Sequence, residues 1–164
     1  MVGRSGYGAQ ALSLGYGCAQ RGVIVHELLH AVGFWHEHSR ADRDDHVTIF
    51  WGNILRGMEH NFQRLSWQFV TNLGAPYDTG SIMHYDPYSF SKDKTSPTIL
   101  PKRRGVSIGQ RFGFSEIDLW KLNRLYACRH SGYSTNDETA ENSINKENGE
   151  SNLWTASIIH CYTF

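Results

Sequence analysis

The chain has 164 residues, of which 16 are Lys or Arg and 16 are Asp or Glu, so its formal net charge is zero. This length fits one domain with room for a hydrophobic core, and the charge balance gives no sign of a nucleic-acid partner or an anionic membrane. No apolar run approaches the length of a membrane span, and residues 1–6 lack the apolar core of a signal peptide.

The first third of the chain predicts a short strand followed by a helix. Residues 9–14 read as a strand between glycine-rich turns at residues 6–8 and 15–17. A helix is expected from about Ala19 to Val32, because apolar residues surround two histidines there. These residues are Val23, Ile24, Leu28, Leu29, Ala31 and Val32.

Residues 26–36 carry the pattern H-E-x-x-H-x-x-G-x-x-H. His26 and His30 are four positions apart, so on a helix they share one face and can reach one metal ion. His36 cannot join them on a continuing helix, because ten residues at 1.5 Å each would place it about 15 Å away along the axis. The chain must therefore reverse between them, and Gly33 is the residue that allows this.

Three neutral imidazoles leave Zn²⁺ an open position for water, which is the arrangement of a catalytic site. The metal lowers the pKa of that water and polarises a carbonyl. Glu27 follows the first histidine on the same helix and is placed to take the proton of the water. The pattern thus predicts a zinc-dependent hydrolytic site with His26, His30 and His36 as ligands and Glu27 as general base.

The middle of the chain predicts short elements and loops. Residues 46–50 are expected to form a short strand or a turn, and residues 53–65 a short helix. Residues 92–104 are loop-like and basic. Within this segment, Lys102, Arg103 and Arg104 are expected to form either a solvated loop or one side of a substrate cleft. No metal spacing links the remaining histidines to the motif: His38, His46, His60, His84, His130 and His160.

The last predicted element is a helix that begins after Ser115, where a Ser-x-x-acid pattern resembles a capping box. An apolar face is expected on this helix, made of Ile117, Trp120, Leu122, Leu125 and Cys128. Residues 131–152 are polar and have a linker composition. Residues 153–164 are apolar but too short to span a bilayer.

The segment that begins at the third histidine, HEHSRADRD over 36–44, and the later SIMHY over 81–85 resemble the astacin family of metzincin endopeptidases. The resemblance runs from about Val2 to Cys128. It implies an α+β, astacin-like zincin catalytic domain with a zinc helix, a Met-turn and a C-terminal helix.

The resemblance also implies roles for residues beyond the motif. Met83 matches the methionine that forms an apolar floor under the metal. Tyr85 matches a tyrosine that is a zinc ligand in the resting enzyme and then hydrogen-bonds the reaction intermediate, a role that suits a phenol near a developing oxyanion. Glu37 matches a glutamate linked to the mature amino terminus in the family. Taken alone, Glu37 is equally suited to pair with Arg40 or Arg43, and the family match favours a structural ion-pair cluster.

Three cysteines are present: Cys18, Cys128 and Cys161. In the family, the cysteines that match Cys18 and Cys128 pair with upstream partners, which here would precede Met1. The resemblance therefore implies an N-terminally truncated domain, the C-terminal part of an astacin domain, with most of its N-terminal sheet missing. A Cys18–Cys128 bridge is conceivable but is not the pairing of the family.

The sequence leads to two competing hypotheses. In the first, residues 1–130 form a partial metallopeptidase domain that binds one Zn²⁺ and cleaves protein or peptide substrates, while residues 131–164 form a tail of unknown role. The resemblance implies that such a protein is secreted. In the second, the chain is a non-catalytic zinc-binding remnant or an interaction fragment of such a protease.

Overall fold

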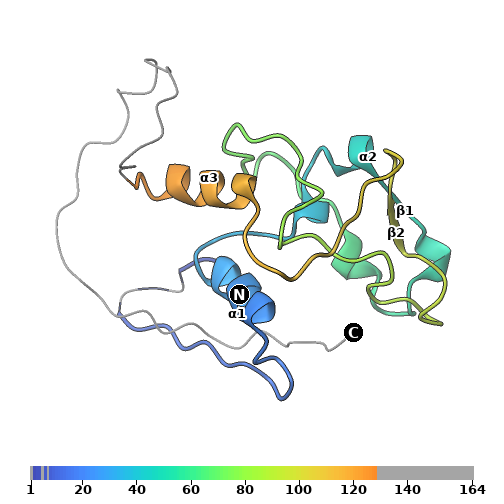
Figure 1. The fold of residues 1–164 in the computed structure, drawn as a ribbon, viewed down its shortest axis with the longest axis horizontal. Coiled ribbons are helices and arrows are strands. Elements are labelled where there is room, and N and C mark those ends of the chain that lie inside the picture. The colour runs from blue at the N-terminus through green and yellow to red at the C-terminus, as the bar shows by residue number, and fades with distance from the viewer. Residues whose placement is uncertain (1, 5, 7, 129–164) are drawn as a thin grey trace.

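The computed structural model describes residues 2–4, 6 and 8–128, so the tail expected over residues 131–164 lies outside the described residues. The helices are α1 (Arg21–Ala31), α2 (Arg43–His46) and α3 (Glu116–Leu125), and the strands are β1 (Val47–Ile49) and β2 (Ile99–Pro101). Short 3-10 turns cover Glu37–Ser39, Trp51–Asn53 and Glu59–Phe62. The remainder consists of loops, which gives the sparse α+β fold of Figure 1.

The sheet of the described residues has two antiparallel strands. Val47 lies opposite Pro101, and Ile49 lies opposite Ile99. Of the two possibilities for residues 46–50, a short strand or a turn, the structure shows the strand, and the 3-10 turn over Glu59–Phe62 lies where a short helix was expected. The inner side of the sheet belongs to the larger of two hydrophobic clusters, whose buried members are Val47, Ile54, Phe62, Tyr85, Ile99 and Ile108.

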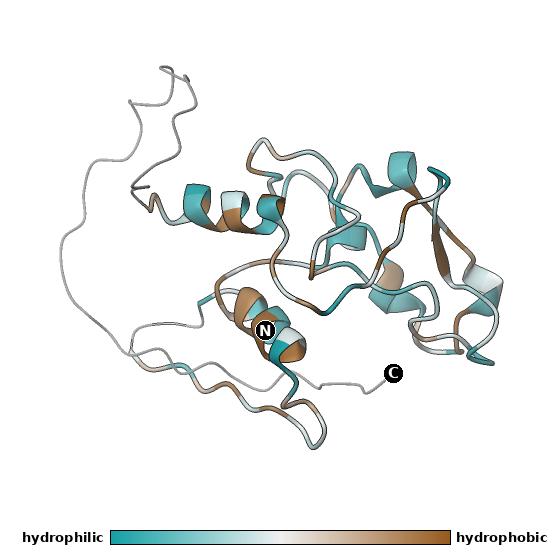
Figure 2. Ribbon diagram, in the orientation of Figure 1, coloured by the Kyte–Doolittle hydropathy of each residue, from teal (hydrophilic) through white to brown (hydrophobic). Residues whose placement is uncertain are grey.

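The second hydrophobic cluster lies between α1 and the segment 82–83. Leu29 packs there against Ile82 and Met83, with Leu122 of α3 at the edge. Figure 2 shows the hydrophobic residues that α1 carries along much of its length. One cluster holds α1 and the other holds β1–β2. The segment that connects α1 to β1 is therefore anchored at both of its ends.

Helix α1 ends where the sequence predicts a reversal. Gly33 adopts a φ of 105°, and its N–H donates to the carbonyl of His30 at 3.0 Å. The N–H of Phe34 donates back to the carbonyl of Leu29 at 2.9 Å. This pair of bonds is the usual way in which a glycine-terminated helix satisfies its last carbonyls. The observed helix lies within the predicted range of residues 19–32.

The strand predicted over residues 9–14 is wrong. This segment has no regular secondary structure, and in Figure 1 it runs as an extended loop below α1. A strand needs a neighbour to receive its backbone hydrogen bonds, and no described segment pairs with residues 9–14. The side-chain amide of Gln10 instead donates to the carbonyl of Gly3 at 3.0 Å.

Helix α3 confirms the predicted capping box and bears out only part of the predicted apolar face. Ser115 and Asp118 exchange reciprocal hydrogen bonds at the start of the helix. Leu122 packs against the second hydrophobic cluster, whereas Trp120 and Leu125 are more than 40% exposed. The buried residues of α3 are instead the charged Asp118 and Lys121. Among the described residues, no helix is long and apolar enough to cross a membrane.

Candidate metal centre

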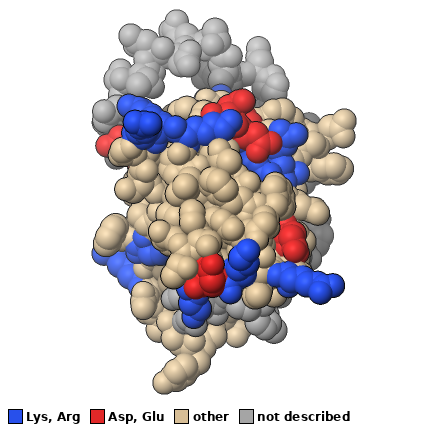
Figure 3. Space-filling view, turned by 90° about the vertical axis from the view of Figure 1, so that its right-hand side faces the viewer, with Lys and Arg blue, Asp and Glu red and all other residues tan. Residues whose placement is uncertain are grey.

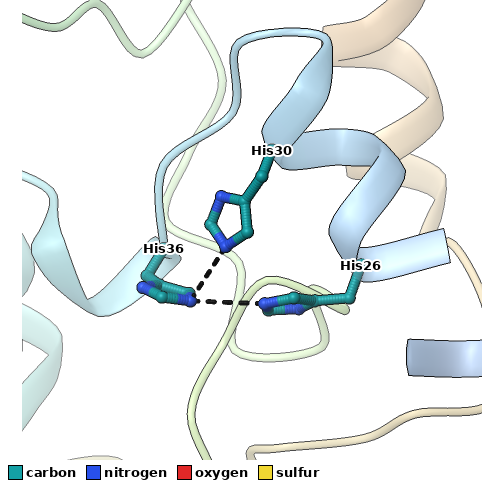
Figure 4. Close-up of side chains that lie close together, drawn as sticks. All are labelled: His26, His30 and His36. Carbon is teal, nitrogen blue, oxygen red and sulfur yellow. Dashed lines mark hydrogen bonds between the residues drawn. The ribbon is translucent and has the colours of Figure 1, made fainter. Parts of the chain in front are cut away.

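Three histidine side chains converge at one point between α1 and the loop that follows it (Figure 4). Helix α1 presents His26 and His30 on one face, and the reversal at Gly33 returns His36 toward them. One ligand atom from each histidine lies within 4.8 Å of the others. The reversal inferred from spacing thus produces the convergence that the sequence predicts.

Backbone carbonyls determine which ring nitrogens face the centre. Nδ1 of His26 lies 2.8 Å from the carbonyl oxygen of Ile82, and Nδ1 of His30 lies 2.7 Å from that of Phe34. Because a carbonyl only accepts hydrogen bonds, each Nδ1 carries the proton. The Nε2 atoms of His26 and His30 are therefore unprotonated, with lone pairs free to bind a metal.

The spacing between the ring nitrogens fits a shared ion. Nε2 of His36 lies 3.2 Å from Nε2 of His26 and 3.1 Å from Nε2 of His30. Two ligands of a tetrahedral zinc with bonds of about 2.0–2.1 Å stand about 3.3 Å apart. A single proton on His36 can satisfy only one of the two contacts. The donor set and the spacing of these two pairs therefore fit Zn²⁺.

Burial keeps these imidazoles neutral. It lowers the pKa of His26 to about 3 and that of His30 to about 4, and the charge of His30 lowers the pKa of His26 further. Burial also holds the pKa of His36 well below its ordinary value. Neutral imidazole is the form that binds metal.

Glu27 lies next to the first histidine and is 5% exposed. Burial raises its pKa to about 7, an effect that the charge of Arg111 partly opposes. Its Oε2 atom is buried and has no hydrogen-bond partner among the described residues. A carboxylate with a pKa near neutrality and a free oxygen has the properties of a general base.

The predicted Met-turn lies against α1 and the 3-10 turn that follows His36. Met83 is 1% exposed and packs in the cluster with Leu29 and Ile82, while its carbonyl accepts from the N–H of Glu37 at 3.0 Å. Tyr85 is 6% exposed, and its ring centroid lies 4.6 Å from that of His36. The structure thus brings Tyr85 beside His36 and packs Met83 against the helix that carries His26 and His30.

Glu37 is the centre of a buried ionic cluster. Its Oε1 accepts from Arg40 at 3.1 Å and from the N–H of Asp78 at 2.9 Å, and its Oε2 accepts from Lys121 at 2.8 Å. Of the two arginines weighed from the sequence, Arg40 is therefore the partner, while Arg43 bonds Asp44 at 2.6 Å. Lys121 could not be identified from local spacing, because it lies 84 positions away along the chain.

Two further residues of the site were missed by sequence reasoning. Asp118 accepts from the hydroxyl of Ser81 at 2.6 Å and from the N–H of Ile82 at 2.9 Å. Arg111 donates to the carbonyls of Ile82 at 3.1 Å and His84 at 3.0 Å. Both therefore hold the segment whose carbonyl orients His26. The capping pattern identified Asp118 as a helix start only, and nothing in the sequence distinguished Arg111 from a surface arginine.

A cavity of about 200 Å³ opens beside His36, between the loop after α1, residues 65–73 and the end of α3. Its lining includes Trp35, Trp67, Phe69, Leu73 and Lys121. None of Lys102, Arg103 and Arg104 lines it, and the backbone N–H of Lys102 instead donates to the carbonyl of His46 at 2.8 Å. Figure 3 shows Lys and Arg interspersed with Asp and Glu on the sheet side.

The cysteines of the described part do not pair with each other. Cys128 is exposed and free, whereas Cys18 is buried. The Cys18–Cys128 bridge considered from the sequence is therefore not formed. Cys161 lies outside the described residues.

The Astacin family of peptidases matches residues 1–127. The zinc metalloproteinase nas-15 of Caenorhabditis elegans is 54% identical over 132 residues, which cover 80% of this chain and 23% of the relative. Meprin A subunit alpha of Rattus norvegicus is 49% identical over 130 residues, which cover 78% of this chain and 17% of the relative. The chain thus spans less than a quarter of these two relatives.

A solved structure shares the fold. High choriolytic enzyme 1, a hatching enzyme zinc-protease from Oryzias latipes, superimposes with a TM-score of 0.68 at 40% sequence identity. The match covers 78% of this chain and 68% of that chain. Together with the family match over residues 1–127, this agreement in sequence and fold shows that the chain belongs to the astacin family of peptidases.

Proposed function

We propose that this chain is a zinc-dependent endopeptidase domain that hydrolyses peptide bonds in protein or peptide substrates. The observation that carries the proposal is the approach of three neutral imidazole nitrogens to within 4.8 Å of one another, beside a buried carboxyl group. Membership of a metalloprotease family supports the same reading.

In this proposal, His26, His30 and His36 hold one Zn²⁺, and Tyr85 joins them in the resting state. Zinc, when bound, lowers the pKa of a water molecule and polarises the scissile carbonyl. The carbonyls of Ile82 and Phe34 orient His26 and His30 through their Nδ1 protons. Such bonds fix the ring orientation and raise the basicity of the nitrogen that faces the metal.

Glu27 is proposed to take the proton of the attacking water and to pass it to the leaving amine. Its position on α1 directly after His26 and its unpartnered Oε2 support this role. A pKa raised to about 7 by burial suits both steps, because the group can then gain and lose a proton near neutral pH.

Tyr85 is proposed to donate its phenol O–H to the oxyanion that develops on the substrate. Burial raises its pKa above the ordinary value, and the charge of Glu27 acts in the same direction. In the absence of metal the phenol therefore keeps its proton at neutral pH. A neutral donor aimed at developing negative charge stabilises the transition state more than the ground state.

The substrate is proposed to be an extended peptide. The resemblance to astacins places the substrate backbone along a sheet edge, with its side chains alternating toward and away from the protein. Secretion is the localisation that the family suggests, and it stays a prediction here.

The test is zinc content together with cleavage of an unfolded protein substrate such as denatured casein. The wild-type chain is compared with Glu27→Ala and with the control Glu59→Ala, which changes an exposed carboxylate in a 3-10 turn. We expect one zinc per chain in all three proteins. Cleavage should fall by about 10²–10⁴-fold in Glu27→Ala alone, as for the loss of a general base.

The remaining outcomes separate the two hypotheses. Zinc binding without cleavage by the wild-type chain would favour the zinc-binding remnant. Cleavage that survives in Glu27→Ala would contradict the assignment of the general base. Absence of stoichiometric zinc would contradict the metal centre itself.

A further inference from the structure

A buried histidine that the proposed mechanism does not use lies against Tyr85. His38 is fully buried in the 3-10 turn after the third ligand, and its ring centroid lies 4.0 Å from that of Tyr85, with the planes inclined by 34°. This distance is shorter than those from Tyr85 to three other rings. His36 lies at 4.6 Å, and Phe62 and Phe90 both lie at 5.7 Å.

One hydrogen bond fixes the orientation of this ring. Nε2 of His38 lies 2.9 Å from the carbonyl oxygen of Asn61. Because that oxygen only accepts, Nε2 carries the proton and Nδ1 has a bare lone pair. The bond connects the turn at residues 37–39 to the turn at residues 59–62 and so resists rotation of the imidazole.

The other ring nitrogen indicates that packing alone does not explain a histidine here. Nδ1 of His38 is buried and has no hydrogen-bond partner within residues 2–4, 6 and 8–128. An unpaired buried polar atom lowers stability, and such atoms in native proteins call for a specific explanation. A purely structural ring at this position would carry no such nitrogen.

Besides His36, two kinds of ring lie beside Tyr85. Phe62 and Phe90 contact it through apolar rings. His38 contacts it through a ring that is locked to the backbone by a directed bond. Its plane therefore sets the plane against which the phenol ring rests.

We propose that His38 is a positioning residue for Tyr85: its imidazole, locked to the carbonyl of Asn61, holds the phenol in the orientation from which it reaches the metal and the substrate oxyanion. The proposal rests on the role proposed above for Tyr85. It assigns no proton transfer to His38, which acts only through the ring that it supports.

The experiment uses the metal-loaded chain and two variants with different defects. His38→Phe keeps an aromatic ring and removes the bond to Asn61, whereas His38→Gln keeps a donor and removes the ring. His60→Phe is the control, because His60 is exposed and bonds only a local carbonyl among the described contacts. Thermal unfolding and zinc content establish which variants are folded and loaded.

The first readout is spectroscopic and does not require activity. Copper(II) bound in place of zinc gives a tyrosinate-to-copper charge-transfer band if Tyr85 is a ligand, and Tyr85→Phe should abolish that band. We expect the band to be weakened or shifted in both His38 variants and unchanged in His60→Phe. A wild-type protein without a Tyr85-dependent band would overturn the role of Tyr85 and this proposal with it.

The second readout is a double-mutant cycle on cleavage. His38→Phe should lower kcat by about 10- to 100-fold with KM unchanged, since small misplacements of a catalytic group cost rates of this order. In the Tyr85→Phe background the same change should have no further effect on kcat. If the band persists unaltered in both His38 variants and the kcat losses multiply, the proposal is overturned while the role of Tyr85 stands.

Discussion

The ammonium of Lys121 on α3 lies 2.8 Å from the carboxylate of Glu37, the residue that follows the third histidine, and both side chains are less than 10% exposed. This contact joins the last helix to the loop that carries His36. Asp118, one turn earlier on α3, joins the same helix to the Met-turn through Ser81 and Ile82. Helix α3 therefore supports both sides of the candidate metal centre through charged side chains.

Removal of the lysine should destabilise the fold. We predict that Lys121→Met lowers the free energy of unfolding by about 3 kcal/mol, because it leaves the buried carboxylate of Glu37 with one cation fewer. Urea unfolding followed by tryptophan fluorescence measures the effect. Lys94→Met, at an exposed position, should change stability by less than about 0.5 kcal/mol.

The double variant Glu37→Gln/Lys121→Met tests the cause. It removes both charges, and it should be more stable than Lys121→Met alone if the unpaired carboxylate is the source of the loss. A double variant that is less stable than the single one would show that the lysine acts through packing of its alkyl chain.

A close approach of two backbones predicts a second effect. A Cβ at Gly22 would lie 1.7 Å from the carbonyl oxygen of Arg111, so α1 packs directly on that segment. Gly22→Ala should therefore lower the free energy of unfolding by at least about 1–3 kcal/mol, the usual cost of overpacking. It should also weaken zinc binding, because α1 carries two of the three histidines.

Gly52→Ala is the matched control for Gly22. A Cβ at Gly52 has no neighbour within 4 Å. The change should be neutral or slightly stabilising, through reduced entropy of the unfolded chain. Equal stability losses in the two alanine variants would contradict the packing argument.

The ion pair between Arg40 and Asp42 predicts a dependence on pH. Two hydrogen bonds at 2.9 and 2.7 Å join the side chains, and they hold the pKa of Asp42 below its ordinary value. A carboxyl whose pKa is depressed by folding stabilises the protein above its unfolded pKa of about 4. That contribution is lost as the pH falls through the lower pKa of the folded state.

Asp42→Asn measures this contribution. At pH 7 the variant should be less stable than wild type by about 1 kcal/mol, since the pair is partly exposed to solvent. The difference should shrink as the pH is lowered below about 4. Loss of zinc at acid pH affects both proteins and cancels in the comparison. A difference that is constant from pH 7 to pH 3 would contradict the assignment.

The cap of α3 gives a fourth prediction. The hydroxyl of Ser115 accepts from the N–H of Asp118 at 2.9 Å and donates to Asp78 at 2.5 Å. Ser115→Ala should lower the free energy of unfolding by about 1–2 kcal/mol, as for the loss of an N-cap. Ser107→Ala, at an exposed position in the preceding loop, is the control and should have little effect on thermal unfolding.

Local spacing predicted the backbone geometry of the candidate metal centre. The interval between His26 and His30 implied one helix face, and Gly33 implied a reversal, both of which are matters of backbone geometry within a few residues. The structure places these residues as expected. The capping box at Ser115 was predictable for the same reason.

Features that depend on long-range contacts were not predictable. Apolar periodicity predicted a buried face with Trp120 and Leu125, yet the buried positions of α3 are Asp118 and Lys121. Their partners are backbone and carboxyl groups far away in sequence, and periodicity carries no information about them. The prediction of a strand over residues 9–14 was wrong for a similar reason. A strand needs a neighbouring strand for its backbone hydrogen bonds, and the local sequence does not show whether one is present.

Zinc K-edge X-ray absorption of the purified, zinc-loaded chain reports the ligands of the metal and so tests the three-histidine centre. We expect multiple-scattering features of three imidazoles, with nitrogen and oxygen ligands at about 2.0–2.1 Å. The variant His36→Ala should lose one imidazole. Sulfur ligands at about 2.3 Å, or an imidazole count that His36→Ala leaves unchanged, would contradict the proposed centre.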